Sequence, residues 1–121
     1  MTTKILLVDD VDEVRRALRT LLSLSDEIEI IGEAANGLEA VRLAESLQPD
    51  VILMDLEMPV MEGYEATRRI KSNFPACRVV ALTVHDYESA RAKAFQSGVD
   101  AFIVKGASVE KIIQSISNRK E

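Results

Sequence analysis

Five short, continuous apolar segments alternate along the chain with longer segments of helical periodicity. The apolar segments consist mostly of β-branched residues or leucine, and they lack the alternation of a strand that has one wet face. Continuous apolar strands indicate a parallel sheet that is covered on both faces, with crossover helices as the cover. We therefore predict strands at residues 5–8, 28–31, 51–54, 79–82 and 101–104.

The segments between these strands carry helix signals. Asn36 and Ser108 mark helix starts, and Gly98 marks a helix end. A βα series of this size predicts a three-layer, doubly wound α/β fold with a five-stranded parallel sheet, the flavodoxin-like strand order 2-1-3-4-5 and five helices. Three apolar stripes have helical spacing: Val14, Ala17, Leu18, Leu21 and Leu22; Ala40, Val41, Ala44 and Leu47; and Val109, Ile112, Ile113 and Ile116.

Composition restricts the partners and the compartment. The chain has 121 residues, which suits one domain, and its net charge of -5 has the wrong sign for binding nucleic acid through phosphates. Cys77 is the only cysteine, and the sequence shows no leader-like segment and no apolar run that could span a membrane. We therefore expect residues 1–121 to form one cytoplasmic domain that contacts neither nucleic acid nor a membrane directly.

Polar side chains follow four of the five predicted strands. Asp9 and Asp10 follow the first, Asp55 the third, Thr83 the fourth and Lys105 the fifth. In doubly wound sheets, ligands bind at this edge, near the point where the strand order reverses between the first and third strands. We therefore expect three carboxylates, a hydroxyl and an ammonium group to converge there.

Such a cluster has an excess of negative charge. Two like charges about 4 Å apart repel by about 4 kcal/mol at an effective dielectric constant of about 20, and one lysine cannot compensate three carboxylates. Mg2+ prefers carboxylate, water and phosphate oxygens. A carboxylate nucleophile, Mg2+, a lysine and a hydroxyl donor are the groups that in-line phosphoryl transfer requires, so the pocket is predicted to serve phosphoryl chemistry.

Each of these residues has a simpler interpretation when it is taken alone. Asp10 or Asp12 would serve as a helix cap. Asp55 would suit a turn, and Lys105 would suit a solvated strand end. The prediction therefore depends on the joint pattern and not on any single position.

The joint pattern resembles the receiver domain of two-component response regulators over essentially the whole chain. The motifs that carry the resemblance are Asp9-Asp10, Asp55 followed by Met58-Pro59 and Gly63, Thr83, and Lys105. The resemblance implies that Asp55 accepts a phosphoryl group from a histidine kinase, a phosphotransfer protein or a small acyl phosphate. It also implies that Asp10, Asp55 and the backbone carbonyl of Glu57 hold Mg2+. Asp9 would act on the metal through water, and Lys105 would pair with the phosphoryl group.

The resemblance further implies a switch and residues that tune it. Thr83 would move to donate a hydrogen bond to the phosphoryl group, and Phe102 would turn inward behind it, although ordinary core packing is the simpler interpretation of Phe102. The change would reach the face formed by the fourth helix, the fifth strand and the fifth helix, whose fourth helix offers small alanine anchors. Glu57 and His85 would flank the phosphoryl group and set its lifetime, or else they are ordinary exposed loop residues.

One motif departs from the common pattern of this family. Gly106 stands where most receivers have proline after the lysine, which leaves the geometry of the Lys105–Gly106 peptide open. The run Lys105-Gly106-Ala107-Ser108 resembles receivers of the NarL/FixJ type, which usually carry a DNA-binding output domain for transcription regulation. We expect no output domain within residues 1–121 and no enzymatic activity beyond the domain's own phosphorylation and dephosphorylation. A homodimer is one expected outcome of phosphorylation.

Three other functions fit parts of the pattern. Asp10-Val11-Asp12 resembles the nucleophile motif of haloacid dehalogenase-like phosphatases, in which Asp10 would attack and Asp55 would have no role. A flavodoxin-like flavin-binding protein is disfavoured because no Ser/Thr/Gly-rich loop follows the first strand. A pseudo-receiver that only binds partners is disfavoured because the acceptor, acid pair, hydroxyl and lysine are all present.

Overall fold

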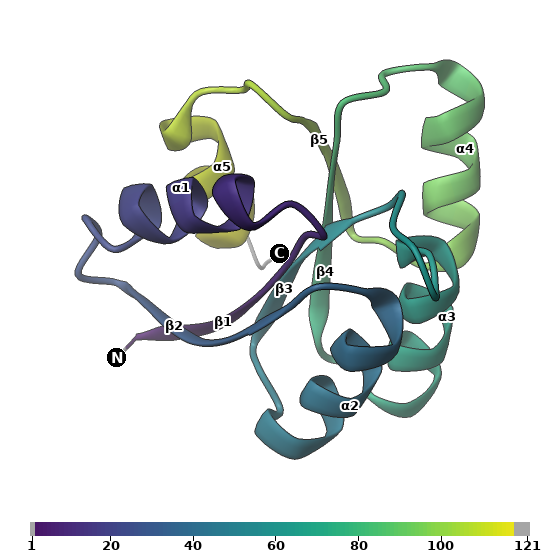
Figure 1. Ribbon diagram of the computed structural model, residues 1–121, viewed down its shortest axis with the longest axis horizontal. Coiled ribbons are helices and arrows are strands. Elements are labelled where there is room, and N and C mark those ends of the chain that lie inside the picture. The colour runs from purple at the N-terminus through teal and green to yellow at the C-terminus, as the bar shows by residue number, and fades with distance from the viewer. Residues whose placement is uncertain (1, 118–121) are drawn as a thin grey trace.

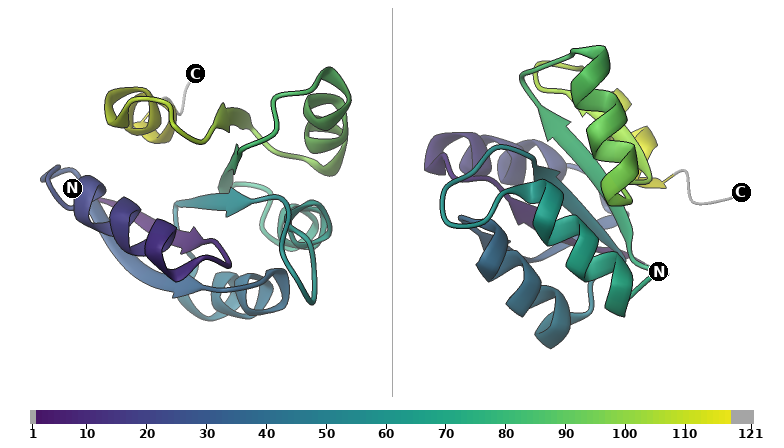
Figure 2. Two further views of the ribbon diagram at one scale, coloured as in Figure 1. Left: turned by 45° about the horizontal axis from the view of Figure 1, so that its top comes forward. Right: turned by 90° about the vertical axis from the view of Figure 1, so that its right-hand side faces the viewer.

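The computed structural model describes residues 2–117, and it confirms the predicted fold. Five parallel strands form one sheet in the order β2-β1-β3-β4-β5, with α1 and α5 on one face and α2, α3 and α4 on the other (Figure 1). The three layers are visible when the molecule is turned (Figure 2). Among the described residues, none of the helices combines the length and apolar composition needed to cross a membrane. The strands are β1 (Thr3–Val8), β2 (Ile28–Ala34), β3 (Val51–Asp55), β4 (Arg78–Thr83) and β5 (Ala101–Val104), and the helices are α1 (Asp12–Leu22), α2 (Gly37–Leu47), α3 (Gly63–Asn73), α4 (Glu88–Ser97) and α5 (Val109–Ser117).

The hydrophobic core consists of two layers, one on each face of the sheet. Leu6 of β1 packs in the layer beneath α2, α3 and α4, whereas its neighbour Leu7 packs in the layer beneath α1 and α5. Both side chains are completely buried, and each such burial contributes about 1.5–3 kcal/mol. The two layers explain why the central strands have no polar face.

The prediction that all five strands are covered on both faces is wrong at the edges of the sheet. β3 and β4 are buried along almost their whole lengths, whereas β2 and β5 have several half-buried or exposed positions. An edge strand has a neighbour on one side only, and the helices cover it less completely. Three residues of the predicted helix stripes, Ala17, Leu21 and Leu47, are exposed and do not belong to the core.

Three helix ends follow the signals in the sequence. Asn36 Oδ1 accepts a hydrogen bond from the backbone N–H of Glu39 at 2.9 Å, at the start of α2. Ser108 Oγ accepts one from the backbone N–H of Lys111 at 3.2 Å, before α5. Gly98 ends α4 with a φ of 111°, a left-handed conformation that glycine adopts without strain.

The simpler interpretation of Asp10 or Asp12 as a cap of α1 is wrong. The helix begins after Val11 and has no side-chain cap. Asp9 Oδ1 instead accepts a hydrogen bond from the backbone N–H of Val11 at 2.9 Å, which closes the turn between β1 and α1. Asp10 therefore has no capping role in this structure.

The loop after β3 is held against the end of the strand. A Cβ atom at Gly63 would lie 2.0 Å from the carbonyl oxygen of Asp55, so only glycine permits this approach. The backbone N–H of Gly63 donates a hydrogen bond to Leu56 O at 3.0 Å, and that of Gly37 donates one to Met61 O at 2.9 Å. These contacts fix the backbone around Asp55.

The peptide between Lys105 and Gly106 is trans, since the described residues contain no cis peptide bond. Gly106 has a φ of 98°. Proline, whose ring fixes φ at about -65°, could not occupy this position in the same conformation. The glycine is therefore part of the local backbone geometry next to Lys105.

Val60, in the loop after β3, carries backbone strain. Its φ is 70°, and its side chain is 78% exposed. The left-handed conformation is costly for a β-branched residue because Cβ approaches the following carbonyl oxygen. No packing of the Val60 side chain compensates for this cost.

We predict that Val60→Gly stabilises the protein by about 1 kcal/mol, because glycine adopts the left-handed conformation without strain. Thermal denaturation should show a Tm about 4 °C higher than that of the wild type. Val84→Gly is the matched control, since Val84 is an exposed loop residue without a positive φ, and its Tm should be unchanged or lower. A Tm for Val60→Gly at or below the wild-type value would contradict the prediction.

Candidate functional site

The carboxyl ends of β1, β3 and β5 bring two carboxylates against one ammonium group. Asp9 and Asp55 are 2% and 5% exposed. The Lys105 Nζ atom lies 2.7 Å from Asp9 Oδ2 and 3.5 Å from Asp55 Oδ2. Buried carboxylates need such a partner, because an uncompensated buried charge is strongly destabilising. The structure thus places together three of the residues that the sequence pattern singles out.

Asp10 completes an acidic group with these two carboxylates. One carboxylate oxygen from each of Asp9, Asp10 and Asp55 lies within 4.8 Å of the other two, and Asp10 is the exposed member. Asp9 Oδ2 is buried, and its contact is the ion pair with Lys105. A hard divalent cation that takes carboxylate oxygens and waters, such as Mg2+, fits this set of donors.

The charges around Asp55 perturb its titration. Burial, reinforced by the charge of Asp9 and opposed by Lys105, raises the pKa of Asp55 to about 7. Burial alone would lower the pKa of Lys105, but the hydrogen bond to Asp9 and the charge of Asp55 outweigh burial and raise it. The ammonium group therefore stays charged, while an added positive charge near Asp55 would favour its ionised form.

Thr83 ends β4 beside the acidic group. It is 2% exposed, and its Oγ1 accepts a hydrogen bond from the backbone N–H of His85 at 3.2 Å. The threonine O–H therefore remains available to donate. Phe102 lies on β5 opposite Ala81, two residues before Thr83 on β4, and it is half-buried against the core layer beneath α2, α3 and α4.

Glu57 lies in the loop after β3 and His85 in the loop after β4, and their side chains contact one another. Glu57 Oε1 lies 2.8 Å from His85 Nε2, and the backbone N–H of Glu57 lies 3.4 Å from Asp55 Oδ1. The His85 ring also stacks on Tyr87, with ring centroids 5.4 Å apart. The sequence places each residue near the site but not against the other, because local sequence does not fix how two loops face one another.

Arg15 contacts the site, although no motif of the sequence singles it out. Its Nη1 donates a hydrogen bond to the carbonyl oxygen of Asp9 at 2.5 Å, and its Nε lies 3.0 Å from Glu33 Oε1 on β2. Its Nη2 lies 2.6 Å from Asp12 Oδ1. Only the pairing with Asp12 has a sequence signal, since residues three apart are neighbours on a helix. The other two contacts arise from the packing of α1 beside β1 and β2.

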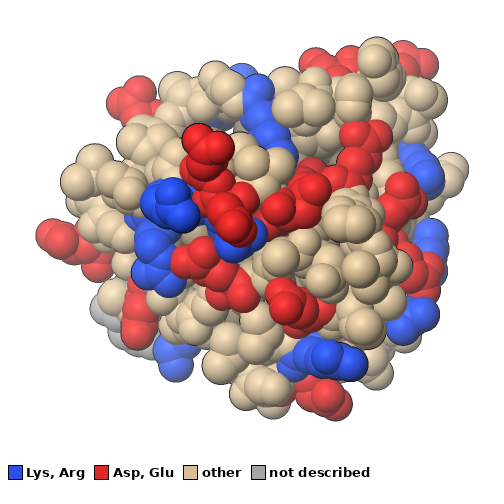
Figure 3. All heavy atoms as spheres, viewed as in Figure 1, with Lys and Arg blue, Asp and Glu red and all other residues tan. Residues whose placement is uncertain are grey.

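Acidic side chains form a broken band across the middle of the face shown in Figure 3, with smaller basic groups between and beside them. Acidic side chains outnumber basic ones in the middle of this face, as the net negative charge of the sequence leads one to expect. No broad basic area, which a phosphate backbone would require, appears on this face.

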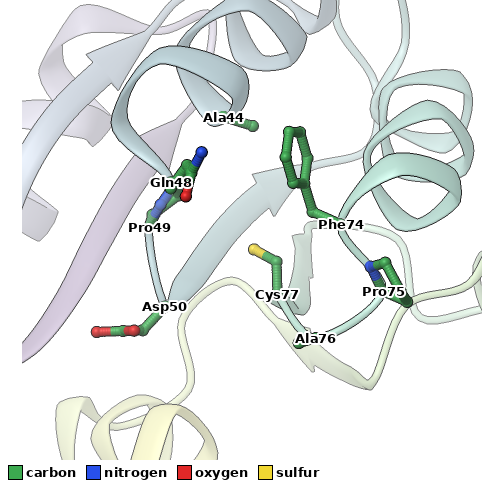
Figure 4. Close-up of a pocket in the computed structure, with 8 residues that line it drawn as sticks. All are labelled: Ala44, Gln48, Pro49, Asp50, Phe74, Pro75, Ala76 and Cys77. Carbon is green, nitrogen blue, oxygen red and sulfur yellow. The ribbon is translucent and has the colours of Figure 1, made fainter.

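A cavity of about 310 Å³ lies at the opposite, amino edge of the sheet (Figure 4). Apolar side chains dominate its lining, among them Phe74, Pro75 and Cys77. Burial raises the pKa of Cys77 to about 11, so the thiol stays neutral and is a poor nucleophile. This cavity lacks the convergent charges of the strand-end site, which is therefore the candidate functional site.

Comparisons with known proteins give matches over almost the whole chain. The family model described as "Response regulator receiver domain" matches residues 5–117. "Response regulator protein VraR" from Staphylococcus aureus is 41% identical over 116 residues, which cover 96% of this chain and 56% of VraR. The chain thus spans about half the length of the curated relatives that it matches.

Solved structures share the fold. A two-component response regulator of the LuxR family from Aurantimonas sp. SI85-9A1 is 34% identical with a TM-score of 0.89, and the match covers 94% of this chain and 81% of that one. A DNA-binding response regulator of the LuxR family from Staphylococcus aureus is 30% identical with a TM-score of 0.90, covering 96% and 97%. The NarL signal receiver domain from Mycobacterium tuberculosis is 28% identical with a TM-score of 0.89, covering 98% of both chains.

The raised pKa of Asp55 predicts a pH-dependent stability. Between about pH 4 and pH 7, the folded protein binds the Asp55 proton more tightly than the unfolded chain does, so the free energy of unfolding falls as pH rises through this window. Asp55→Asn cannot ionise, and we expect it to be more stable than the wild type at about pH 8, without divalent cations, by on the order of 2 kcal/mol. The difference should shrink towards about pH 4, as measured by urea denaturation.

The matched control for this experiment is Asp26→Asn, which removes an exposed carboxylate in a turn. Its stability relative to the wild type should not change with pH in the same way. A stability difference for Asp55→Asn that is the same at both pH values would contradict the prediction.

Proposed function

The chain belongs to the response-regulator receiver domain family, of the NarL-like kind, and on this premise we propose that Asp55 is its phosphoacceptor. The observation that carries the proposal is the position of the Asp55 carboxylate, which is buried, paired with Lys105 and grouped with Asp9 and Asp10. In this arrangement Asp55 has one cation beside it, Lys105, and two further carboxylates that suit a metal ion, and a transferred phosphoryl group needs such positive charge.

The proposed reaction is a transfer of a phosphoryl group to Asp55. A carboxylate oxygen of Asp55 attacks the phosphorus of a phosphohistidine or a small acyl phosphate, and the donor leaves with the electron pair of its own bond to phosphorus. Lys105, already 3.5 Å from Asp55 Oδ2, would remain beside the new phosphoryl oxygens. The domain is consumed as the acceptor in each reaction, and hydrolysis of the aspartyl phosphate restores it.

We propose that Asp10, Asp55 and the backbone carbonyl of Glu57 hold Mg2+, with Asp9 contributing through water. The grouping of the carboxylate oxygens of Asp9, Asp10 and Asp55 within 4.8 Å of one another supports this set of ligands. When bound, Mg2+ neutralises charge on the oxygens of the transferring phosphoryl group.

Thr83 and Phe102 are the proposed switch residues. Phosphorylation replaces the carboxylate by a group with a charge of about -1.5 to -2 and strong acceptor oxygens. The buried Thr83 O–H would donate to one of these oxygens, and the half-buried Phe102 would move into the space behind it. The change would reach the face formed by α4, β5 and α5.

In a longer protein, signal reception and output would belong to different domains. We infer that residues 1–121 form one receiver domain, whose partner is a histidine kinase or a phosphotransfer protein. The relative from Staphylococcus aureus described as DNA-binding supports an output in transcription regulation. Because this chain has an acidic excess, we assign contact with DNA to a region outside it. Dimer formation on phosphorylation is one route by which the receiver could control such an output.

The phosphatase alternative, in which Asp10 is the nucleophile and Asp12 assists, has less support. Asp12 pairs with Arg15 and its side chain is 70% exposed. It does not belong to the acidic group that Asp9, Asp10 and Asp55 form. The receiver assignment instead gives Asp55 a role, and the family match runs through it.

We predict that incubation with acetyl phosphate and Mg2+ adds one phosphoryl group to the wild-type protein, as read by intact mass. Asp55→Asn should show no adduct because it lacks the nucleophile, and chelation of Mg2+ should suppress the adduct in the wild type. Asp12→Ala is the matched control and should be phosphorylated like the wild type. An adduct that persists in Asp55→Asn and disappears in Asp12→Ala would support the phosphatase, and no adduct with any donor would support the pseudo-receiver.

Glu57 and His85 are predicted to set the lifetime of the phosphoryl group without being required for its formation. Their contact at 2.8 Å ties together the two loops beside Asp55, where water must enter for hydrolysis. Glu57→Asn and His85→Ala should still be phosphorylated, but the phosphate should decay with a rate at least about twofold different from the wild type. Wild-type decay in both variants would show that the two residues are ordinary loop residues.

A further inference from the structure

Helix α4 has few apolar anchors. Of its ten residues, only Ala94 and Ser97 are buried, and residues 88–93 at its start are exposed or half-buried. It stands at one side of the molecule beside α3, where it follows the loop that leaves β4 (Figure 1). Burial of apolar side chains therefore does not explain what holds the first half of this helix in place.

Arg91 connects the first half of α4 to the edge strand of the sheet. Its guanidinium carbon lies 4.7 Å from the centroid of the Phe102 ring on β5, a distance at which a cation is attracted to the ring face. Its Nε lies 2.9 Å from Asp86 Oδ1 in the loop before the helix. Arg91, Asp86 and Phe102 line a small cavity of about 170 Å³ on this face.

Lys93 makes the corresponding contact with the neighbouring helix. Its Nζ lies 4.2 Å from the centroid of the Tyr64 ring on α3, and Tyr64 is 7% exposed. Residues two positions apart on a helix point to different sides. Arg91 and Lys93 therefore hold α4 from two sides, one against the sheet and the other against α3.

Both rings are connected to the proposed acceptor site by short stretches of backbone. Tyr64 follows Gly63, whose backbone lies against the carbonyl oxygen of Asp55. Phe102 is opposite Ala81, two residues before Thr83. A displacement at Asp55 or Thr83 would thus reach both rings through one or two residues.

Cation–π contacts differ from apolar packing in what happens when they break. A buried side chain that moves out leaves a cavity, whereas a half-exposed ammonium or guanidinium group is hydrated again. A helix held in this way can change position at a modest cost. Few buried contacts and several exposed side chains are also the properties of segments that open locally.

We propose that Arg91 and Lys93 are positioning residues that hold α4 in its unphosphorylated arrangement through cation–π contacts with Phe102 and Tyr64. This proposal deepens the proposed function and rests on it, because a Phe102 ring that moves inward would move away from the guanidinium group of Arg91. Arg91 then opposes the switch, and Lys93 anchors the helix to α3.

The first test is backbone hydrogen exchange over residues 88–97 of the unphosphorylated protein. Arg91→Met and Lys93→Met keep side chains of similar length but remove the cation, and each should speed exchange by about threefold. Arg91→Lys keeps a cation and should restore part of the protection. Arg42→Met, an exposed arginine on α2, is the matched control and should leave exchange in α4 unchanged. Wild-type exchange in both Met variants would overturn the proposal.

A double-mutant cycle separates the ring contact from the pairing with Asp86. If Arg91 acts through the ring, Arg91→Met should add no further exchange to Phe102→Leu, and Asp86→Asn should have a smaller effect than Arg91→Met. Protein labelled with fluorophenylalanine gives a spectroscopic readout, since the chain has three phenylalanines. The Phe102 signal, assigned by its loss in Phe102→Leu, should shift in Arg91→Met while the Phe74 signal stays. Additive exchange effects, or an unmoved Phe102 signal, would overturn the role of the ring.

Phosphorylation distinguishes this proposal from the one on which it rests. With acetyl phosphate and Mg2+, Arg91→Met should form the adduct about twofold faster than the wild type. The variant lacks the cation–π contact with Phe102, so the free-energy cost of moving α4 is lower. Equal rates together with faster exchange would overturn the role of Arg91 in the switch. An absent adduct in the wild type would overturn the phosphoacceptor assignment instead, and the exchange data would still decide whether the cations hold α4.

Discussion

The pairing of Lys105 with Asp9 and Asp55 is the interaction on which the site depends. Two carboxylates that lie almost completely out of water repel one another, and the ammonium group between them is the compensating charge. The compensation is incomplete, because Asp10 adds a third carboxylate and the pKa of Asp55 remains raised to about 7. The remaining negative charge is what the proposed Mg2+ would compensate, and the same imbalance makes the pKa of Asp55 sensitive to changes in the local charge.

The scaffold around this charge cluster is uneven in rigidity. The three central strands are buried on both faces, and Gly63 lies against the backbone of Asp55, so the position of this proposed acceptor is fixed by the scaffold. On the side of β5, the strand is half-buried and α4 is anchored by alanine, serine and two cation–π contacts. A change of charge at Asp55 would thus act next to a helix with few buried side chains, which suits the proposed response to phosphorylation.

The pattern of apolar residues predicts most of the fold, because strands and helices are signalled by residues that are close together in the sequence. The continuous apolar runs at residues 51–54 and 79–82 indicate doubly covered strands, and the observed strand order is the one typical of a doubly wound sheet of five strands. The same reasoning fails at β2 and β5, since a run of apolar residues carries no mark of whether its strand lies at an edge. It also fails at Asp10 and Asp12, where a cap suited the sequence, but Val11 occupies the N-cap position and Asp9 closes the turn.

Sequence alone determined which residues meet at the carboxyl edge, because residues that end parallel strands converge whatever their side chains do. Asp9, Asp10, Asp55, Thr83 and Lys105 follow from that rule. The tertiary structure alone decided the pairwise geometry: Glu57 against His85, Arg15 against the Asp9 carbonyl, and Arg91 over Phe102. These contacts join segments 6 to 28 positions apart whose relative orientation depends on how loops and helices pack. Packing of this kind leaves no periodic or local trace in the sequence.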